Sequence, residues 1–331
     1  MYDIITIGSA TQDVYLFSKK FRICKDSRVT TGEVESFAFG TKIELDDILF
    51  EIGGGATNTA YTFIRQGLKV ACLTKVGSDG AGEEVKKMLR KAKISTDLVI
   101  TDPKHRTAHS VIFLGQNGER TILVYRGASH EFRTKDVIFQ KLKNTKWFFI
   151  TSIGGNLNLL RKIVYFANKN KIKVALNPGK LELEHGFNKL KQIFKKVDIL
   201  FLNKEEAAEI LKRSYTDEKG IINDMKDISS GIIVVTEAEK GALVCNGKNK
   251  FRLTIRPLKA VDTTGAGDAY GSGFVAGYIK KRDIQFAIKL AAANSAGEVM
   301  KIGAKQGLLS GKLNEFKKLL RLLKLKIEKI K

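Results

Sequence analysis

The sequence predicts an α/β protein with a mostly parallel β-sheet, helices on both faces, and a second, smaller β-sheet. Short apolar, β-branched runs alternate with amphipathic stretches, which is typical of parallel strands joined by crossover helices. The chain has 331 residues, of which 43% are hydrophobic, enough to bury one large core. Two segments that lack this alternation predict the second sheet.

The elements of the main body can be placed in chain order. Strands are expected at Ile4–Ile7, Val70–Thr74, Trp147–Thr151, Val174–Leu176, Ile199–Leu202 and Ile232–Thr236. Helices are expected at Thr57–Gln66, Gly80–Lys91, Leu157–Asn168, Lys204–Lys212, Ala266–Lys280, Ile284–Met300 and from Lys312 onward.

The second sheet is predicted by a hairpin and by one irregular region. His109–Leu114 and Arg120–Tyr125 flank Asn117-Gly118, a pair that tolerates the positive φ of a tight antiparallel turn. The region from Val14 to Phe50 can also form strands. We therefore assign 1–14, 51–105 and 127–310 to the main body, 15–50 and 106–126 to a β lid, and 311–331 to a C-terminal basic amphipathic helix.

The charge balance is strongly basic, because 58 Lys and Arg against 35 Asp and Glu give a formal charge of +23. Such a charge raises the question of a nucleic-acid or anionic-membrane partner. The basic residues are spread along the chain and do not alternate with aromatic residues as in a stacking groove. We therefore expect solvated lysines and no nucleic-acid partner.

Hydropathy and cysteine content bear on the cellular location and on disulfide or zinc sites. No apolar run approaches the roughly 18 residues that a membrane span requires, and Met1 leads within three residues into an expected strand. We expect a cytoplasmic protein without a membrane span. Three dispersed cysteines without a Cys-x-x-Cys pair favour neither a disulfide framework nor a zinc site.

The most informative stretch runs from Asp262 to Asp268, Asp-Thr-Thr-Gly-Ala-Gly-Asp, and opens an expected helix. Its glycines let backbone N–H groups point at one spot, and a helix N-terminus favours an anion there. Asp268, in the first turn, could accept the proton of an attacking hydroxyl group. Taken alone, the same residues are explained by an Asp helix cap after a glycine turn.

A second glycine cluster, Gly53-Gly54-Gly55-Ala56-Thr57-Asn58, also precedes an expected helix. Glycine allows close approach of the backbone to a polyol, and Asn58 offers both a donor and an acceptor. Taken alone, a loop with an Asn near the start of a helix is an equal explanation.

Together the two patterns resemble the two fingerprints of the ribokinase-like (PfkB) carbohydrate kinase family. Gly53 to Gly77 resembles the first fingerprint and Asp262 to Val275 the second, in the correct order and about 200 residues apart. The resemblance spans roughly Gly8 to Gly307. It implies a Rossmann-like α/β body with a β lid, and an ATP- and Mg²⁺-dependent kinase that phosphorylates a primary hydroxyl group of a sugar.

The resemblance also implies a role for each matched residue. Asp268 would be the catalytic base, and the amides of Gly265, Ala266 and Gly267 would stabilise the moving phosphoryl group. The acceptor would be held by Asp13, Gly54, Gly55 and Asn58. The nucleotide side would be formed by Asn203, Glu206, Thr236, Gly241 and Asn294. Glu206 would bind Mg²⁺ through water, and Asp262 is a possible K⁺ ligand, as in part of the family.

The sequence departs from the family pattern at two places. A Gly is usual two residues after Thr236, where this chain has Ala238, so the backbone approach to the nucleotide is expected to differ slightly. Ribokinases usually carry an acidic residue near Phe149-Ile150-Thr151-Ser152, and none is present here. This absence argues against ribose and leaves an adenosine-type nucleoside kinase as an alternative.

A function of another class is also open. The segment from Lys312 to Lys331 carries eight Lys or Arg among repeated Leu, so the chain could be a non-catalytic binder of nucleic acid or a membrane surface on a kinase fold. A terminal helix packed on the domain explains the same pattern. The exposed lid sheet would allow a homodimer. A P-loop kinase is not expected, because no Gly-x-x-x-x-Gly-Lys-[Ser/Thr] is present.

Overall fold

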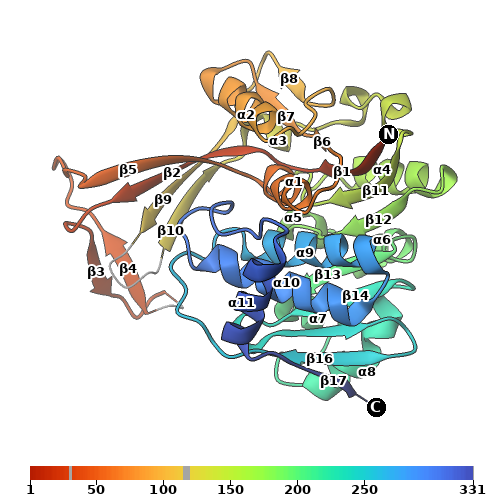
Figure 1. The fold of residues 1–331 in the computed structure, drawn as a ribbon. Helices are drawn as coiled ribbons and strands as arrows, with labels where there is room; N and C mark the ends of the chain where they lie inside the picture. The colour runs from red at the N-terminus through yellow and green to blue at the C-terminus, as the bar shows by residue number, and fades with distance from the viewer. Residues whose placement is uncertain (30–31, 115–119, 331) are drawn as a thin grey trace.

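The computed structural model describes residues 1–29, 32–114 and 120–330. Its centre is a nine-stranded sheet in the order β17-β16-β15-β14-β13-β12-β11-β1-β6 (Figure 1). Six neighbouring strands are parallel, which confirms the prediction: β1 (Tyr2–Ile7), β6 (Val70–Leu73), β11 (Thr145–Ile150), β12 (Lys173–Leu176), β13 (Ile199–Asn203) and β14 (Ile232–Thr236). Their carboxyl ends meet at one edge of the sheet.

Three antiparallel strands extend this sheet beyond β14, namely β15 (Ala242–Cys245), β16 (Lys250–Thr254) and β17 (Lys326–Ile330). The prediction of a helix through 331 was therefore wrong in its second half. Helix α11 (Leu313–Leu323) ends where Lys324 adopts a left-handed φ of 43°, and the chain then pairs with β16. The partner strand decides this outcome, because the segment is amphipathic in either conformation.

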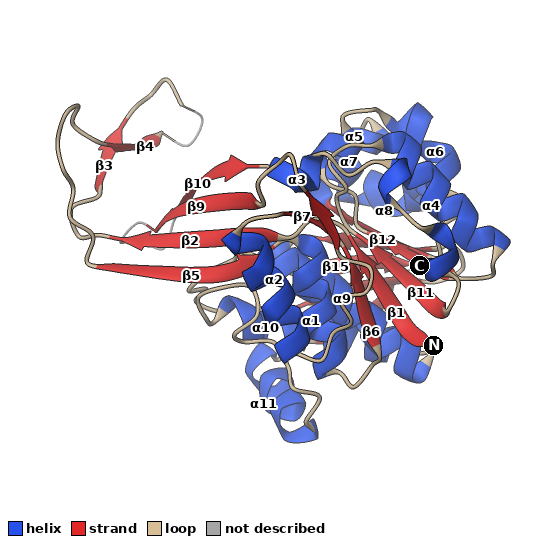
Figure 2. Cartoon of the chain, turned by 90° about the horizontal axis from the view of Figure 1, so that it is seen from above, coloured by secondary structure: helices blue, strands red, loops and turns tan. Residues whose placement is uncertain are grey.

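Helices cover both faces of the sheet, as Figure 2 shows. One face carries α1 (Gly55–Arg65), α2 (Gly80–Lys91), α9 (Ala266–Lys281), α10 (Ile284–Val299) and α11. The other carries α4 (Leu157–Lys169), α6 (Phe187–Phe194), α7 (Lys204–Leu211) and α8 (Glu218–Ile228). Successive residues of β1 serve both cores, since Ile4 is buried on the first face and Ile5 on the second.

Several short elements connect these layers. They are β7 (Lys75–Gly77), β8 (Ile100–Asp102), α3 (Gly127–His130), α5 (Lys180–Leu183) and the 3₁₀ turns Thr134–Asp136, Phe139–Leu142 and Ala238–Lys240. Strands β7 and β8 form a separate parallel pair beside the main sheet. Among the described residues, no helix is both long and apolar enough to cross a membrane.

The lid is a four-stranded sheet in the order β10-β9-β2-β5. Its strands are β2 (Thr11–Phe17), β5 (Asp47–Gly53), β9 (Ala108–Leu114) and β10 (Arg120–Tyr125). The pairing of β9 with β10 is antiparallel, as expected for the hairpin, whereas β2 runs parallel to β9 and makes the sheet mixed. The expected turn at Asn117-Gly118 lies outside the described residues.

The lid projects to one side of the body, and β3 (Arg22–Lys25) and β4 (Glu33–Ser36) form a ribbon at its far end (Figures 1 and 2). Strand β2 begins at Thr11 and β5 ends at Gly53, so the lid sheet reaches a few residues closer to the body than 15–50. Because β2 follows β1 and β5 runs into α1, the lid is rooted at the carboxyl edge of the main sheet.

Candidate active site

The two glycine motifs meet at this carboxyl edge. Asn58 lies near the start of α1, and Asp268 lies in the first turn of α9, which packs beside α1 in the same core. The Nδ2 group of Asn58 donates a hydrogen bond to Oδ2 of Asp268 at 2.9 Å, although the residues are 210 positions apart. The structure thus brings the expected base and an expected acceptor-binding residue into direct contact.

The turn before α9 has the geometry of an anion cradle. Gly265 has a φ of 93°, and a Cβ there would lie 2.5 Å from Cβ of Ala304, so glycine is required. A Cβ added to Gly267 would meet no described atom within 4 Å, so there is open space at the N-terminus of α9. The Ala266 amide already donates to the Thr263 carbonyl at 3.2 Å, so it is less available than the other two.

Asp13 approaches the same place from lid strand β2. Its side chain is buried, and Oδ1 accepts a hydrogen bond from Thr11 at 2.9 Å. Burial raises the pKa of Asp13, while hydrogen bonds from Ser110 and Thr11 and the charge of Lys305 act against that rise. A Cβ at Gly53 would lie 1.8 Å from Oδ2 of Asp13, so the carboxyl group fits only against glycine.

The glycines at the β5–α1 corner serve close packing of the backbone. Gly54 has a φ of 92°, and a Cβ there would lie 2.6 Å from the carbonyl oxygen of Ser9. The amide of Gly55 donates to the Ser9 hydroxyl at 3.3 Å. Through these contacts the β5–α1 corner packs against the segment between β1 and β2. Asp13 and Asn58 therefore lie in one site.

The expected nucleotide side lies at the ends of β13 and β14, which β11 and β12 separate from β1. Asn203 ends β13 and pairs in register with Thr236, which ends β14. Oδ1 of Asn203 accepts from the Glu206 amide, and Oε2 of Glu206 accepts from the Asn203 amide, both at 2.8 Å. This capping box uses one carboxylate oxygen of Glu206 and leaves the other for a metal-bound water. Burial raises the pKa of Glu206.

A family model for pfkB carbohydrate kinases matches residues 1–309. The chain belongs to the pfkB family. This pfkB kinase is a phosphotransferase with an alcohol group as acceptor, in a family of sugar and nucleoside kinases.

Individual relatives agree with this assignment. An uncharacterized sugar kinase from Archaeoglobus fulgidus is 28% identical over 251 residues, which cover 74% of this chain and 96% of the relative. A nucleoside kinase from Methanocaldococcus jannaschii has a TM-score of 0.75 at 22% identity, covering 96% of this chain and 98% of that one. A putative ribokinase II from E. coli, in complex with ATP and Mg²⁺, has a TM-score of 0.78 at 18% identity, covering 97% and 99%. These two likenesses show the ribokinase fold.

The loop after Thr236 explains one departure of this pfkB kinase from the family pattern. Ala238 adopts a φ of 48°, in the left-handed region that glycine enters more easily than alanine. Gly241 has a φ of 106°, and a Cβ there would lie 2.1 Å from the Leu253 carbonyl oxygen. Ala238 thus keeps a glycine-like conformation at some conformational cost.

The structure argues against the expected nucleotide contact of Asn294. This side chain is fully buried on α10. Its Nδ2 group donates to Thr62 at 3.2 Å and to the Ala269 carbonyl at 2.8 Å, and its Oδ1 accepts from the Leu309 amide at 3.0 Å. Both donor hydrogens are therefore used inside the protein, and Asn294 ties α1, α9 and α10 together. A polar residue in a helix does not reveal from sequence which way it points.

Asp262 connects the lid to the glycine turn before α9. Its Oδ2 accepts hydrogen bonds from the Tyr15 hydroxyl at 2.9 Å and from the Gly303 amide at 3.0 Å, and its Oδ1 accepts from the Thr264 amide at 2.8 Å. Tyr15 belongs to lid strand β2. The expected cation ligand is thus also a structural acceptor that holds the turn in place.

Two buried charged residues of the site were missed by sequence reasoning. Lys305 is 5% exposed and contacts Asn58, and Glu298 is fully buried with its Oε1 facing Gly265. Neither carboxylate oxygen of Glu298 has a hydrogen-bond partner among the described residues. Both lie outside the two matched fingerprints, so no local motif marked them in the sequence.

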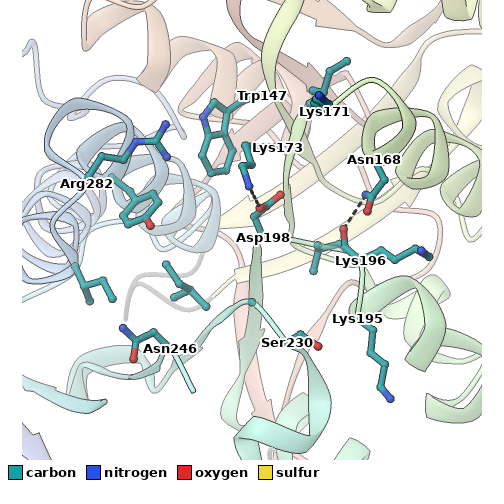
Figure 3. A pocket seen from close by; sticks show the side chains of 16 residues that line it. Trp147, Asn168, Lys171, Lys173, Lys195, Lys196, Asp198, Ser230, Asn246 and Arg282 are labelled. Atoms are coloured by element: carbon teal, nitrogen blue, oxygen red, sulfur yellow. Dashed lines mark hydrogen bonds and ion pairs between the residues drawn. The ribbon is translucent and has the colours of Figure 1, made fainter. Parts of the chain in front are cut away.

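A cavity of about 660 Å³ at the other end of the sheet is not this site. It lies at the amino ends of β11 to β14 and is lined by Trp147, Lys173, Asp198 and Arg282, among others. Figure 3 shows Lys173 turned toward Asp198, which it contacts at 2.8 Å. Catalytic groups of parallel α/β sheets gather at the carboxyl ends of the strands, the edge that carries Asp13 and Asp268.

Proposed function

We propose that this pfkB kinase transfers the γ-phosphoryl group of ATP to a primary hydroxyl group of a sugar, with Asp268 as the general base. The observation that carries the proposal is the 2.9 Å hydrogen bond from Asn58 to Asp268. It joins the acceptor-side motif to a carboxylate at a helix N-terminus, and these are the two parts that must meet for phosphoryl transfer to a hydroxyl group.

Each residue of the site has a chemical task in this proposal. Asp13 and Asn58 orient the acceptor, and Asp268 takes the hydroxyl proton as the oxygen attacks the γ-phosphorus and ADP leaves. The amides of Gly265 and Gly267, at the positive end of α9, stabilise the charge on the moving phosphoryl group. Glu206 would hold Mg²⁺ through water, and the ion would neutralise phosphate charge.

A monovalent cation is also part of the proposal, next to this turn. Asp262 lies beside Glu298, whose carboxylate oxygens are buried without a partner among the described residues. A buried carboxylate without a partner is costly, and a cation would satisfy it. We propose that these two residues hold K⁺. Equal turnover in potassium and sodium-only buffers would argue against this part of the proposal.

A nucleoside is the alternative acceptor. Asp13 and Asn58 recognise hydroxyl groups, which a furanose presents with or without an attached base. The end of β11 offers no acid, because Thr151 stands there and is packed against Gly8 and Gly55. This arrangement supports a sugar other than ribose, or a nucleoside.

The C-terminal segment supports catalysis over a binding function of another class. Leu319 and Leu323 of α11 are buried in the core, and β17 pairs along its length with β16. The tail is therefore built into the body, and its lysines face solvent as solvated charges.

We also propose that the lid sheet pairs with a second copy of the chain.

The test is ADP release from purified protein with ATP and Mg²⁺ against a panel of sugars and nucleosides. Asp268→Asn keeps the size of the side chain and removes the base, so we expect turnover to fall by about 10² or more while ATP binding and the circular dichroism spectrum stay unchanged. Near-normal turnover of this variant would disprove the assignment of the base.

A further inference from the structure

Lys305 is a buried ammonium group beside the proposed base. It follows the Gly303-Ala304 turn after α10 and is 5% exposed. A buried ammonium group is costly unless it is hydrogen-bonded and balanced by negative charge. The partners of Lys305 therefore indicate why the fold keeps it there.

Both partners are oxygen atoms that accept hydrogen bonds, and both lie where the substrate hydroxyl group is proposed to bind. The Nζ group donates to Oδ1 of Asn58 at 2.5 Å and to the carbonyl oxygen of Ile52, which precedes the glycine run. Asn58 in turn donates from Nδ2 to Asp268 at 2.9 Å. Lys305, Asn58 and Asp268 thus form one continuous chain of hydrogen bonds.

The direction of this chain follows from chemistry. An ammonium group has donors but no acceptor, so the Asn58 atom that faces it must be the carbonyl oxygen. The amide nitrogen of Asn58 must then face Asp268, where it can donate to a carboxylate. In the flipped orientation, the carbonyl oxygen would face the carboxylate and the NH₂ group would face the ammonium, and both contacts would be repulsive. Lys305 therefore removes the ambiguity that a side-chain amide otherwise has.

The charge of Lys305 acts on the same carboxylate. Burial raises the pKa of Asp268, while the hydrogen bond from Asn58 and the positive charge of Lys305 lower it. A general base must be ionised at the working pH. Lys305 thus acts on Asp268 twice, through the orientation of Asn58 and through its own charge.

We infer that Lys305 is a positioning residue of the catalytic centre, which holds the Asn58 amide in the orientation that donates to Asp268. The inference rests on the proposed function, since it assigns Lys305 a role toward the base. It goes beyond the two fingerprints, because Lys305 lies outside both.

The charged surroundings determine the expected pH dependence. Lys305 faces Asp13 of β2, Glu51 of β5, Asp268 of α9 and the Cys72 thiol of β6. Burial outweighs the first three charges and lowers the pKa of Lys305 to about 8. The charge of Asp268 also raises the pKa of Glu298 of α10. Wild-type protein therefore keeps the positive charge below about pH 8 and loses it as the pH rises further.

The experiment compares pH profiles of kcat for wild type and Lys305→Met. At neutral pH we expect kcat of the variant to fall about tenfold or more, within the range for general-base catalysis. The acid limb should move to higher pH, because Asp268 loses a charge that lowers its pKa. The alkaline change near pH 8 should disappear, and the KM for ATP should stay the same.

Gln306→Met is the matched control, because Gln306 is the exposed neighbour and its side chain hydrogen-bonds only to Glu51 among the described residues. This variant should keep the wild-type profile. Lys305→Arg restores a positive charge and should recover the position of the acid limb better than Met does. If Lys305→Met does not fold, Lys305→Gln, which is polar and uncharged, gives the same comparison.

A double variant separates the two proposals. If Asp268 is the base and Lys305 acts through it, Lys305→Met should lower turnover no further in an Asp268→Asn background. An inactive Asp268→Asn beside a folded Lys305→Met with wild-type kcat and acid limb would overturn the role of Lys305 alone. An active Asp268→Asn would overturn the proposed function itself.

Discussion

The buried carboxyl group of Glu298 makes the stability of the fold depend on pH. It is fully buried, and burial together with the charges of Asp262 and Asp268 raises its pKa to about 9. Without a cation beside Glu298, the folded protein therefore holds this proton over a pH range in which the unfolded chain, with an ordinary glutamate pKa of 4.5, releases it. The stability that comes from the protonated form is complete below pH 4.5 and is lost as the pH rises toward 9.

Glu298→Gln should remove this pH dependence, because glutamine resembles the protonated acid and does not ionise. We expect the free energy of unfolding to exceed that of wild type by a few kcal/mol at pH 8, since each pKa unit corresponds to about 1.4 kcal/mol. At pH 5 the two proteins should be close to equal. Urea unfolding in buffers without sodium or potassium measures both values, and an equal difference at the two pH values would contradict the prediction.

Sequence reasoning proposed candidate site residues that lie in local patterns and missed those that approach them through tertiary contacts. Asp268, Gly265 and Asn58 stand in glycine motifs whose geometry is local. Lys305 becomes part of the site only because the turn after α10 packs against α1, and the hydrogen bond joining Tyr15 to Asp262 spans 247 positions. Without knowledge of such packing, a lone Lys or Tyr carries no signal.

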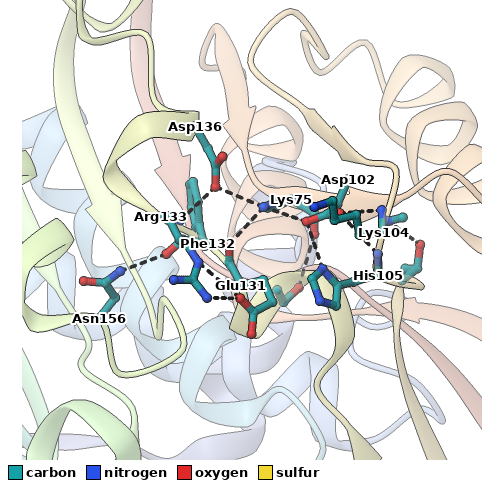
Figure 4. Close-up of polar contacts among 12 residues, drawn as sticks. Lys75, Asp102, Lys104, His105, Glu131, Phe132, Arg133, Asp136 and Asn156 are labelled. Carbon is teal, nitrogen blue, oxygen red and sulfur yellow. Dashed lines mark hydrogen bonds and ion pairs between the residues drawn. The ribbon is translucent and has the colours of Figure 1, made fainter.

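At the scale of elements, a buried ion cluster joins β7, β8 and the 3₁₀ turn at Thr134–Asp136. Lys75 of β7 is 6% exposed and contacts Asp102 at 2.7 Å and Asp136 at 3.0 Å (Figure 4). Its Nζ group also donates to the Glu131 carbonyl at 2.9 Å. These contacts fix the segment that leads into lid strand β9.

Lys75→Met should destabilise the protein by about 3–5 kcal/mol, because it leaves buried carboxylates without their cation. Lys87→Met, in the exposed pair with Glu84, is the control and should cost less than about 1 kcal/mol. Burial alone would raise the pKa of Asp102, but hydrogen bonds from Lys75 and nearby backbone amides hold it below its usual range. The cost of Lys75→Met is therefore complete at pH 7 and shrinks below about pH 3.8. Equal costs for the two variants in chemical denaturation would contradict this.

The elements that sequence predicted best are those whose conformation is set by their own pattern. The strand Ile232–Thr236 and the helix Gly80–Lys91 match the structure at both ends. The C-terminal segment was misjudged because its apolar residues suit a helix or a strand, and pairing with β16 decides between them. Helix α8 was missed although Asp217 caps it through the Gly220 amide at 2.9 Å.

At the scale of the whole molecule, the outer face of the lid carries a row of exposed apolar side chains. The strand register aligns Phe50, Val14, Val111 and Leu123 in one row across the four strands, on the face opposite Asp13 and Tyr15. Phe50 is 58% exposed and Leu123 is 57% exposed. Monomers rarely leave a contiguous apolar face in water, so a second copy of the same sheet is the expected cover.

Leu123→Asp places a charge in the middle of this row and should prevent such pairing. We expect wild-type protein to be a dimer by light scattering at tens of micromolar, and the variant to be a monomer with an unchanged circular dichroism spectrum. Ile138→Asp is the control, since Ile138 is similarly exposed at 59% but lies outside the lid sheet. A monomeric wild-type protein would contradict the proposal that a second copy covers the apolar face of the lid. If the variant is monomeric and its KM for the acceptor rises while the KM for ATP does not, pairing also stabilises the lid strand that carries Asp13.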